Sequence, residues 1–226
     1  MKNKSDKNYF LNENVEVSHA VMLAAIYNHD IQPKLLSART DDGNTILHFA
    51  ALRGAFDVVE FVVECAPGLL YQFNDYGDSV LHSAAASGNL RALQFLIQKI
   101  PHFVSKVNED GNTILHLAAL SGKLDAVEFI VTCDPSLLHQ FNKEGDTVLH
   151  IATTSGKLDV LQFLIQKIPH FIHNVNEDGN TILHLAAIYS QPDTISFIID
   201  FAPLLATQRN NQNQLYVDVE CIGMDE

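Results

Sequence analysis

The sequence contains few cysteines and few basic residues. Three cysteines occur among 226 residues, Cys65, Cys133 and Cys221, and none has the CxxC or Cys/His spacing of a zinc site. A disulfide framework is not indicated, so we expect a reducing compartment. Lys and Arg total 14 against 27 Asp and Glu, which gives a net charge of −13. Such a charge repels phosphate backbones, so we expect no direct nucleic-acid binding.

Long apolar runs are also absent. No stretch approaches the roughly 20 consecutive apolar residues that span a membrane. The segment 17–27 contains His19 and follows Glu13 and Glu16, which departs from a secretory signal. We therefore expect no membrane insertion and a cytoplasmic location. Apolar residues still make up 47% of the chain, too many for an intrinsically disordered protein.

The sequence repeats itself every 34 residues, and such a period indicates a repeat architecture. The string G-[ND]-[TS]-[IV]-L-H begins at Gly43, Gly77, Gly111, Gly145 and Gly179. Prolines keep the same step at Pro67, Pro101, Pro135, Pro169 and Pro203. A period of 68 lies on top, because residues 93–119 recur at 161–187 with changes only at 104–106. The chain is therefore built from alternating repeats of two kinds.

The pattern within each 34-residue unit predicts two short helices. Residues 45–53 form the first, with Thr45 or Asn44 placed to cap its start. Gly54 suits the left-handed residue that closes such a helix. The second helix is apolar around most of its girth and ends two residues before Pro67, since proline stops a helix. The structure is expected to be all-α.

These residues resemble the ankyrin repeat family, whose pattern includes D-x-x-G-x-T-P-L-H-x-A-A. The chain departs from it with Ile or Val in place of Pro, at Ile46, Val80, Ile114, Val148 and Ile182. The resemblance implies an all-α ankyrin-repeat solenoid of helix-turn-helix units joined by hairpin loops. Five repeats would span residues 39–210. Residues 1–38 would hold a degenerate capping repeat, and residues 211–226 a partial cap or tail.

Five histidines recur at one position of the repeat: His48, His82, His116, His150 and His184. Equivalent positions in stacked helices lie about 10 Å apart, too far for shared zinc bonds of about 2 Å. We therefore expect no metal and no cofactor. The resemblance implies that each histidine joins the Thr three residues earlier and nearby backbone amides in a hydrogen-bond network.

No catalytic motif is found in the sequence. It contains no GxxxxGK[ST], GxGxxG, HExxH or GxSxG string. Cys65 and Cys133 are expected to be buried apolar side chains. An alternative is that Cys133, with Asp134 and His139, acts as a nucleophile with a base. We expect no enzyme, and any enzyme would have to be built on the repeat surface.

Asparagines occupy one hairpin position, at Asn74, Asn108, Asn142, Asn176 and Asn210. Asn commonly bonds backbone groups in turns, and we expect that role here. The resemblance adds a second interpretation, because a host oxygenase hydroxylates asparagines at this position in many ankyrin proteins. The five asparagines are therefore candidate modification sites as well.

The remaining candidate function is binding at the surface. Acidic side chains are expected on the hairpin tips, namely Asp41, Asp42, Asp75, Asp78, Glu109, Asp110, Glu144, Asp146, Glu177 and Asp178. On the first helices the variable positions include Arg53, Leu120, Ile188 and Tyr189, and Tyr76 and Tyr189 are the expected aromatic anchors. The resemblance implies a protein partner, with a basic surface if the acids steer it. Alternatively, the acids only keep an elongated monomer soluble.

Composition suggests two origins. The Lys- and Asn-rich residues 1–14, the lack of Trp and the acidic end look like ankyrin effectors that intracellular bacteria such as Legionella deliver into the host cytoplasm. The alternative is a eukaryotic cytosolic adaptor, or an inhibitor that regulates a partner enzyme.

Overall fold

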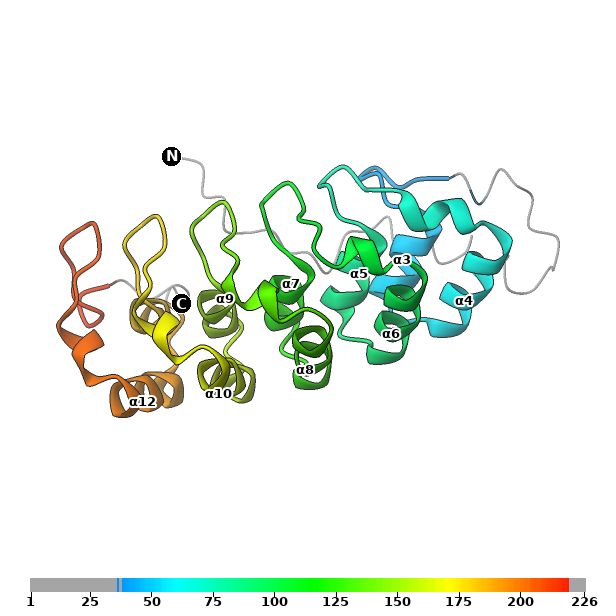
Figure 1. Ribbon diagram of the computed structural model, residues 1–226. Coiled ribbons are helices and arrows are strands. Elements are labelled where there is room, and N and C mark those ends of the chain that lie inside the picture. The colour runs from blue at the N-terminus through cyan, green and yellow to red at the C-terminus, as the bar shows by residue number, and fades with distance from the viewer. Residues whose placement is uncertain (1–35, 37, 220–226) are drawn as a thin grey trace.

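The structure is a computed structural model that describes residues 36 and 38–219, and it is a stack of helix pairs with hairpins along one side (Figure 1). The first helices are α3 (Ile46–Leu52), α5 (Val80–Ser87), α7 (Ile114–Ser121), α9 (Val148–Thr154) and α11 (Ile182–Ile188). The second helices are α4 (Phe56–Cys65), α6 (Leu90–Lys99), α8 (Leu124–Cys133), α10 (Leu158–Lys167) and α12 (Pro192–Phe201). A short 3-10 helix follows each: η1 (Pro67–Tyr71), η2 (Pro101–Phe103), η3 (Pro135–His139), η4 (Pro169–His173) and η5 (Pro203–Thr207).

The all-α solenoid is confirmed. Within residues 38–219 the only β pairings are isolated bridges at the hairpins, such as Phe73 with Ser79. No helix of the described part of the chain is long and apolar enough to cross a bilayer. The predicted capping repeat at the amino terminus lies outside the described residues, apart from Leu36 and Ala38.

Capping determines where each first helix begins. The Thr45 side chain accepts a hydrogen bond from the backbone N–H of His48, and the Thr45 N–H donates to Nδ1 of His48. This reciprocal arrangement satisfies two amides that the first turn leaves unpaired. All five first helices have the same pairing of the N-cap residue with the histidine three residues later. The expected histidine–threonine network is thus confirmed, with Ser79 in place of Thr in the second repeat.

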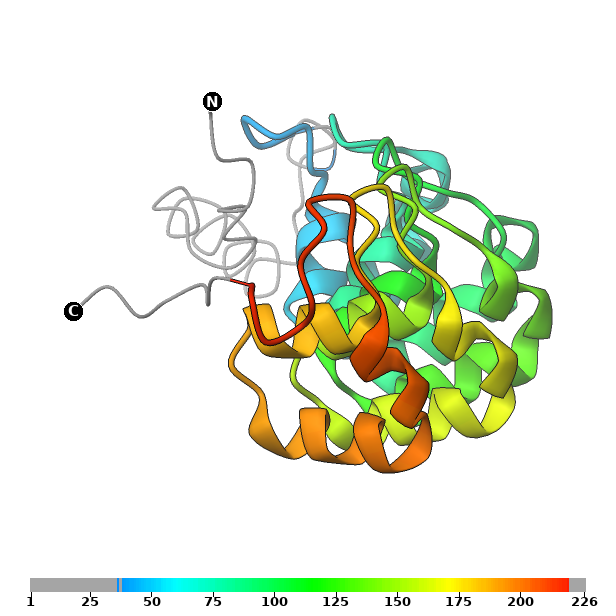
Figure 2. The same cartoon turned by 90° about the vertical axis from the view of Figure 1, so that its left-hand side faces the viewer.

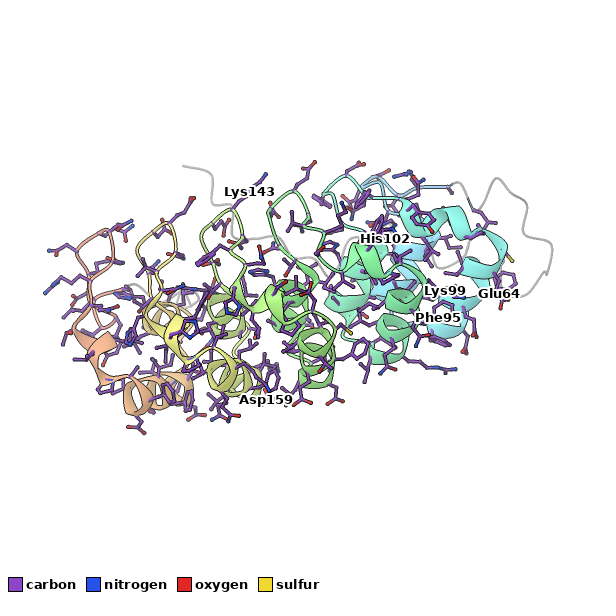
Figure 3. All side chains as sticks on the ribbon, in the orientation of Figure 1. Glu64, Phe95, Lys99, His102, Lys143 and Asp159 are labelled. Atoms are coloured by element: carbon purple, nitrogen blue, oxygen red, sulfur yellow. The ribbon has the colours of Figure 1, made fainter. Side chains whose placement is uncertain are left out.

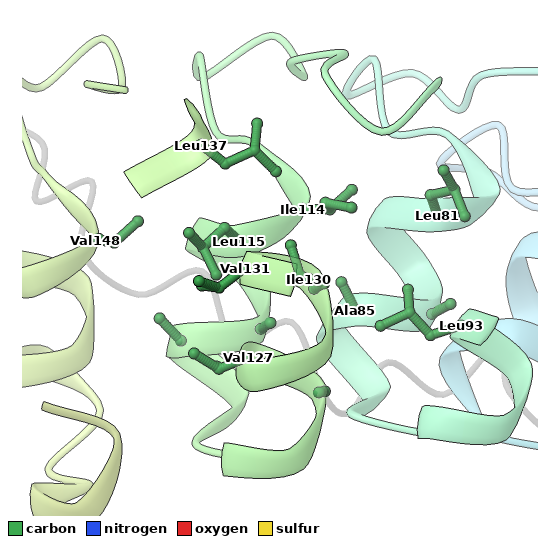
Figure 4. Packing of buried hydrophobic residues seen from close by; sticks show 14 of the residues in the cluster. Leu81, Ala85, Leu93, Ile114, Leu115, Val127, Ile130, Val131, Leu137 and Val148 are labelled. Carbon is green, nitrogen blue, oxygen red and sulfur yellow. The ribbon is translucent and has the colours of Figure 1, made fainter. Parts of the chain in front are cut away.

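The core runs without interruption along the stack (Figure 4). Each first helix buries one leucine completely, at Leu47, Leu81, Leu115, Leu149 and Leu183. Small buried alanines such as Ala85 and Ala118 let neighbouring first helices pack closely. Isoleucine and valine from the second helices, including Val127 and Ile130, close the core from the other side. A repeat cannot bury these faces alone, so each one depends on its neighbours.

The hairpins are bonded to one another tip to tip. The backbone N–H of Asp75 donates to the carbonyl of Asp42 at 3.0 Å, and that of Glu109 donates to Tyr76 at 2.8 Å. The pattern continues to the end of the stack, where Asn211 N–H donates to Asp178 O at 3.0 Å. Residues 210–214 therefore form a further hairpin after α12, closed by a bond from Asn210 N–H to Gln214 O. In Figure 2, which views the stack from the α12 end, the first helices and the 3-10 helices lie on opposite sides of the hairpin bases.

Replacing Gly111 by Val should destabilise the protein by about 1–3 kcal/mol. Gly111 has φ of +78°, as its turn position predicts, and a Cβ there would lie 2.9 Å from the backbone nitrogen of Lys143 in the next hairpin. Thermal and urea unfolding measure the loss. Gly68→Ala is the matched control because no heavy atom lies within 4 Å of its added Cβ. Equal melting of the Gly111 variant and the native chain would contradict the strain argument.

Candidate interaction surface

One residue in each hairpin links it to the following repeat, and at Asp78, Asn112 and Asn180 this residue joins three successive repeats. The carbonyl of Asp78 accepts a hydrogen bond from Nε2 of His48 in the preceding repeat at 3.0 Å. Its Oδ1 accepts from Nδ2 of Asn108 in the following repeat at 2.8 Å. Equivalent positions hold Asn44, Asn112, Asp146 and Asn180, whose side-chain oxygens accept from the next repeat in the same way. We call these five residues the linking positions.

The recurring asparagines provide the donors for these links. Oδ1 of Asn74 accepts from the backbone N–H groups of Tyr76 and Asp78 at 3.0 and 2.8 Å, and Nδ2 donates to Asn44 at 2.9 Å. The other four asparagines make the same bonds. The expectation that they bond backbone groups is confirmed, and each also reaches the preceding repeat. Asn108 and Asn210 are buried, while the other three are half-buried.

Two of the expected tip acids are not on the exposed edge. Asp78 and Asp146 are only 8% and 7% exposed, because they occupy linking positions. Burial raises the pKa of Asp146 to about 6, and repulsion from Glu144 and Asp178 adds to the shift. The signal for this role was present in the sequence, since Asn and Asp alternate at one position of the 34-residue period. Both side chains supply the short acceptor that the link needs.

The histidines are buried and neutral. Because a carbonyl can only accept, Nε2 of His48 carries the proton and Nδ1 accepts. Burial lowers the pKa of His48, His116 and His150 to about 4, and it also lowers the pKa of His82 and His184. Nε2 of His116 has no hydrogen-bond partner among the described residues. No group of three or more His, Cys, Asp or Glu in this part of the chain could hold a metal ion.

The remaining acids lie on the hairpin tips. The exposed acids are Asp41, Asp75, Glu109, Glu144, Glu177 and Asp178, whereas Asp42 and Asp110 are half-buried. The Tyr76 hydroxyl donates to Oδ1 of Asp42 at 2.9 Å, so this half-buried tyrosine braces two neighbouring tips. Lys143 is the basic residue among them, at the tip labelled in Figure 3.

The first helices expose two large side chains at their carboxyl ends. Leu120 is 40% exposed and Tyr189 is 39% exposed, and the neighbouring Ile188 is half-buried. Partial burial raises the pKa of the Tyr189 phenol, and the negative charges of Asp146 and Glu144 raise it further. Tyr189 therefore lies within electrostatic reach of an acidic hairpin. The Arg53 guanidinium is exposed over the Phe49 ring, 5.2 Å from its centroid.

A second group of exposed apolar residues was missed from the sequence. Tyr71, Phe73, Val107, Phe141 and Val175 are between 40% and 51% exposed at or just before the first arms of the hairpins. Four of them directly precede a recurring asparagine, so the 34-residue period could have identified the position. Its exposure could not be recognised, since an apolar residue next to a turn looks like part of the core.

The cysteines were predicted wrongly. Cys65 and Cys133 are exposed, not buried. Each of them is the last residue of its helix, α4 or α8, and the last residues of α6 and α10 are Lys99 and Lys167. A lysine at the equivalent position indicates that this position faces solvent. Partial burial and the charge of Asp134 raise the pKa of the Cys133 thiol, which works against a reactive thiolate.

Comparisons with known proteins match the repeated part of the chain. A family model described as "Ankyrin repeats (3 copies)" matches residues 64–138 and 132–211, and one described as "Ankyrin repeat" matches residues 42–70. Among solved structures, a chain in the complex of the predatory endopeptidase Bd0816 from Bdellovibrio bacteriovorus with immunity protein Bd3460 is similar, with a TM-score of 0.64. It is 24% identical, and the match covers 80% of this chain and 91% of that one. A search of curated proteins gave no match.

The protein should lose stability as the pH falls from 6.5 to 4. Histidines of the unfolded chain take up protons near pH 6.5, whereas His48, His116 and His150 resist protonation to about pH 4 in the fold. Each costs on the order of 3 kcal/mol over that window. Asp146 opposes the trend, because its raised pKa lets the folded state bind a proton first. Unfolding free energies measured from pH 7 to 4.5 test the sign.

A variant pair isolates the histidine contribution. His150→Gln should destabilise at pH 7, and its disadvantage should shrink as the pH falls, because the unfolded variant has one fewer proton to gain. His170→Gln is the control, since His170 is exposed. A constant difference between the native chain and His150→Gln across the range would refute the assignment.

Proposed function

Because the chain belongs to the ankyrin repeat family, whose fold is typically a non-enzymatic scaffold for protein interactions, we propose that it binds a partner protein through its hairpin tips and first-helix face. The observation that carries the proposal is the position of Tyr189. Its exposed ring lies at the end of α11, and its phenol is influenced by Glu144 and Asp146 of a hairpin. An exposed aromatic ring therefore lies within electrostatic reach of Glu144 at a hairpin tip.

The proposed partner presents basic groups to the tips and an apolar group to Tyr189 and Leu120. Binding energy concentrates in a few aromatic and apolar anchors at the centre of an interface. The acids around them steer a partner of opposite charge. The proposed contact residues are Asp41, Asp42, Arg53, Asp75, Tyr76, Glu109, Asp110, Leu120, Glu144, Glu177, Asp178, Ile188 and Tyr189.

The biological setting belongs to the same proposal. An effector that a bacterium delivers into a host would bind a host protein, whereas a cytosolic adaptor or inhibitor would bind an enzyme of its own cell. The similar solved chain comes from a complex of an endopeptidase with an immunity protein, and a likeness of 24% identity supports the fold alone. Inhibition of a purified partner enzyme on mixing would favour the inhibitor. Hydroxylation of the five hairpin asparagines and a monomeric state stay predictions.

Neutralising the exposed tip acids should abolish capture of the partner from a eukaryotic lysate. The variant changes Asp75, Glu109, Glu144, Glu177 and Asp178 to Asn or Gln. The control changes five exposed acids of the second helices in the same way: Asp57, Glu60, Glu64, Asp125 and Glu128. Both variants change the net charge equally, so only the position of the charge differs. Proteins captured in each case are identified by mass spectrometry.

A partner that binds all three proteins equally would contradict a role for the tips. Asp78 and Asp146 are left unchanged because their buried carboxylates hold neighbouring hairpins together. The melting temperatures of both variants are compared with that of the native chain beforehand. Loss of binding then reports on the surface and not on folding.

Binding of a captured partner should weaken steeply as salt rises. Exposed charges are screened over about 8 Å at physiological ionic strength, and the tips carry several charges. Dissociation constants measured between 50 and 500 mM salt test this. A constant that does not change with salt would rule out steering by the acidic tips, whereas Tyr189→Ala should weaken binding at every salt concentration.

A further inference from the structure

Two groups of aromatic side chains lie beneath the hairpins on the side of the 3-10 helices. The first consists of Tyr71, Phe73, His102 and Phe103, and the second of His139, Phe141, His170 and Phe171. We call them the arm clusters. Each residue of the first cluster has its counterpart in the second 68 residues later. The two-repeat period of the sequence therefore places a similar group of rings twice along the stack. Figure 3 labels His102 at the first cluster.

The rings within each arm cluster contact one another. Phe73 stacks on Phe103 with centroids 5.5 Å apart, and Tyr71 meets the same ring edge-on at 5.9 Å. In the second cluster Phe141 stacks on Phe171 at 5.9 Å. These distances are those of favourable aromatic pairs. Each cluster is thus a preformed platform.

The platforms remain open to solvent. Tyr71 is 51% exposed, and Phe73 and Phe141 are 40% and 49% exposed. Exposed apolar groups that gather in one place commonly mark a binding surface. The clusters are carried by the 3-10 helices and the first hairpin arms, and the 3-10 helices lie on the other side of the hairpin bases from the first helices (Figure 2), whereas Tyr189 directly follows α11.

The chain covers other rings with its own cations. Arg91 lies over Phe56 at 3.9 Å, and Lys99 lies over Phe95 at 5.2 Å. No cation–π contact among the described residues involves Tyr71, Phe73 or Phe141, although Arg39 lies beside Phe73 and donates to its backbone carbonyl at 3.0 Å. Aromatic faces attract cations, and arginine in particular stacks on them. The open rings therefore match a cation supplied from outside.

Carboxylates lie on the hairpin tips beyond both arm clusters. Asp75 and Glu109 lie two residues beyond Phe73 and Val107 on the same hairpin arms, and two residues of chain span at most about 7 Å. Glu144 lies three residues beyond Phe141 on the tip above the second cluster, and Glu177 lies on the next tip, whereas Lys143, directly before Glu144, holds the position that Asp75 has at the first cluster. Within residues 38–219 none of the four acids forms an ion pair. An arginine on a ring could therefore pair with a carboxylate at the same time.

We propose that the arm clusters bind an extended, arginine-containing segment of a partner protein, one arginine and a neighbouring apolar side chain to each cluster. The clusters are two repeats apart, which is about 20 Å at the usual spacing of packed helices. An extended chain covers about 3.3 Å per residue, so the two arginines are about six residues apart. The inference uses the tip acids of the proposed function but places the partner's segment on a different face.

A defined peptide tests the proposal. The probe is a fluorescein-labelled dodecapeptide with Arg-Leu at positions 3–4 and 9–10 and Gly or Ser elsewhere, and its binding is followed by fluorescence anisotropy. Phe73→Ser with Phe141→Ser should weaken binding by about tenfold or more, since two stacking sites are lost. Replacing Arg by Lys in the probe should weaken binding to the native chain, because a lysine stacks less well. Replacing Arg by Glu should abolish it.

Leu204→Ser is the matched control, because it removes an apolar side chain that is 70% exposed in η5, outside both arm clusters. Absence of binding at 1 mM probe, or equal binding by the native chain and the double phenylalanine variant, overturns the inference. The proposed function is tested separately, by the capture of a partner from the lysate. A partner that the double variant retains and Tyr189→Ala loses would refute the arm clusters and leave the proposed function standing.

Discussion

The hydrogen bond from each hairpin asparagine to the linking position of the preceding repeat is the constraint on which the rest of the structure depends. One side chain closes its own hairpin through Oδ1 and holds the neighbouring hairpin through Nδ2. His48, His82 and His150 each add a second link by donating to the carbonyl of the next linking position, as His150 does to Asn180. Hairpins and helices are thereby locked into one repeat geometry.

That internal rigidity leaves the outward-facing side chains free to differ. The tips tolerate Asp, Glu, Lys or Tyr because none of these is needed to hold the hairpin closed. The residue before each asparagine is Phe, Val or, before Asn210, Arg209, which donates a hydrogen bond across its own hairpin to Asn213 O. In such a scaffold, the residues available for binding a partner are those that the hairpins do not need for closure. Asp75 is such a residue, whereas Asp78, three residues further on, is not. The first is exposed and the second is a buried acceptor.

Periodicity made most of the fold predictable. The second helices end two residues before their prolines, Gly54 has a positive φ, and Thr45 caps α3, all as the pattern indicated. The errors arose where one residue type fits two environments. An acid near a turn can be a solvated charge or a buried acceptor, and Asp146 proved to be the latter. A cysteine in an apolar helix suggests burial, yet Cys65 ends its helix on the wet side. The arm clusters combine residues from different repeats, and only the stacked structure brings Phe73 to Phe103.

The 68-residue unit also has a consequence for how the protein can change in length. Residues 93–119 and 161–187 are nearly identical, and both the acidic and the amide linking positions recur at the same step. A chain that lost residues 93–160, or gained a copy of them, would meet only interfaces that already exist in the stack. The molecule can therefore grow or shrink by pairs of repeats, adding or removing one aromatic platform each time, without any new packing problem to solve.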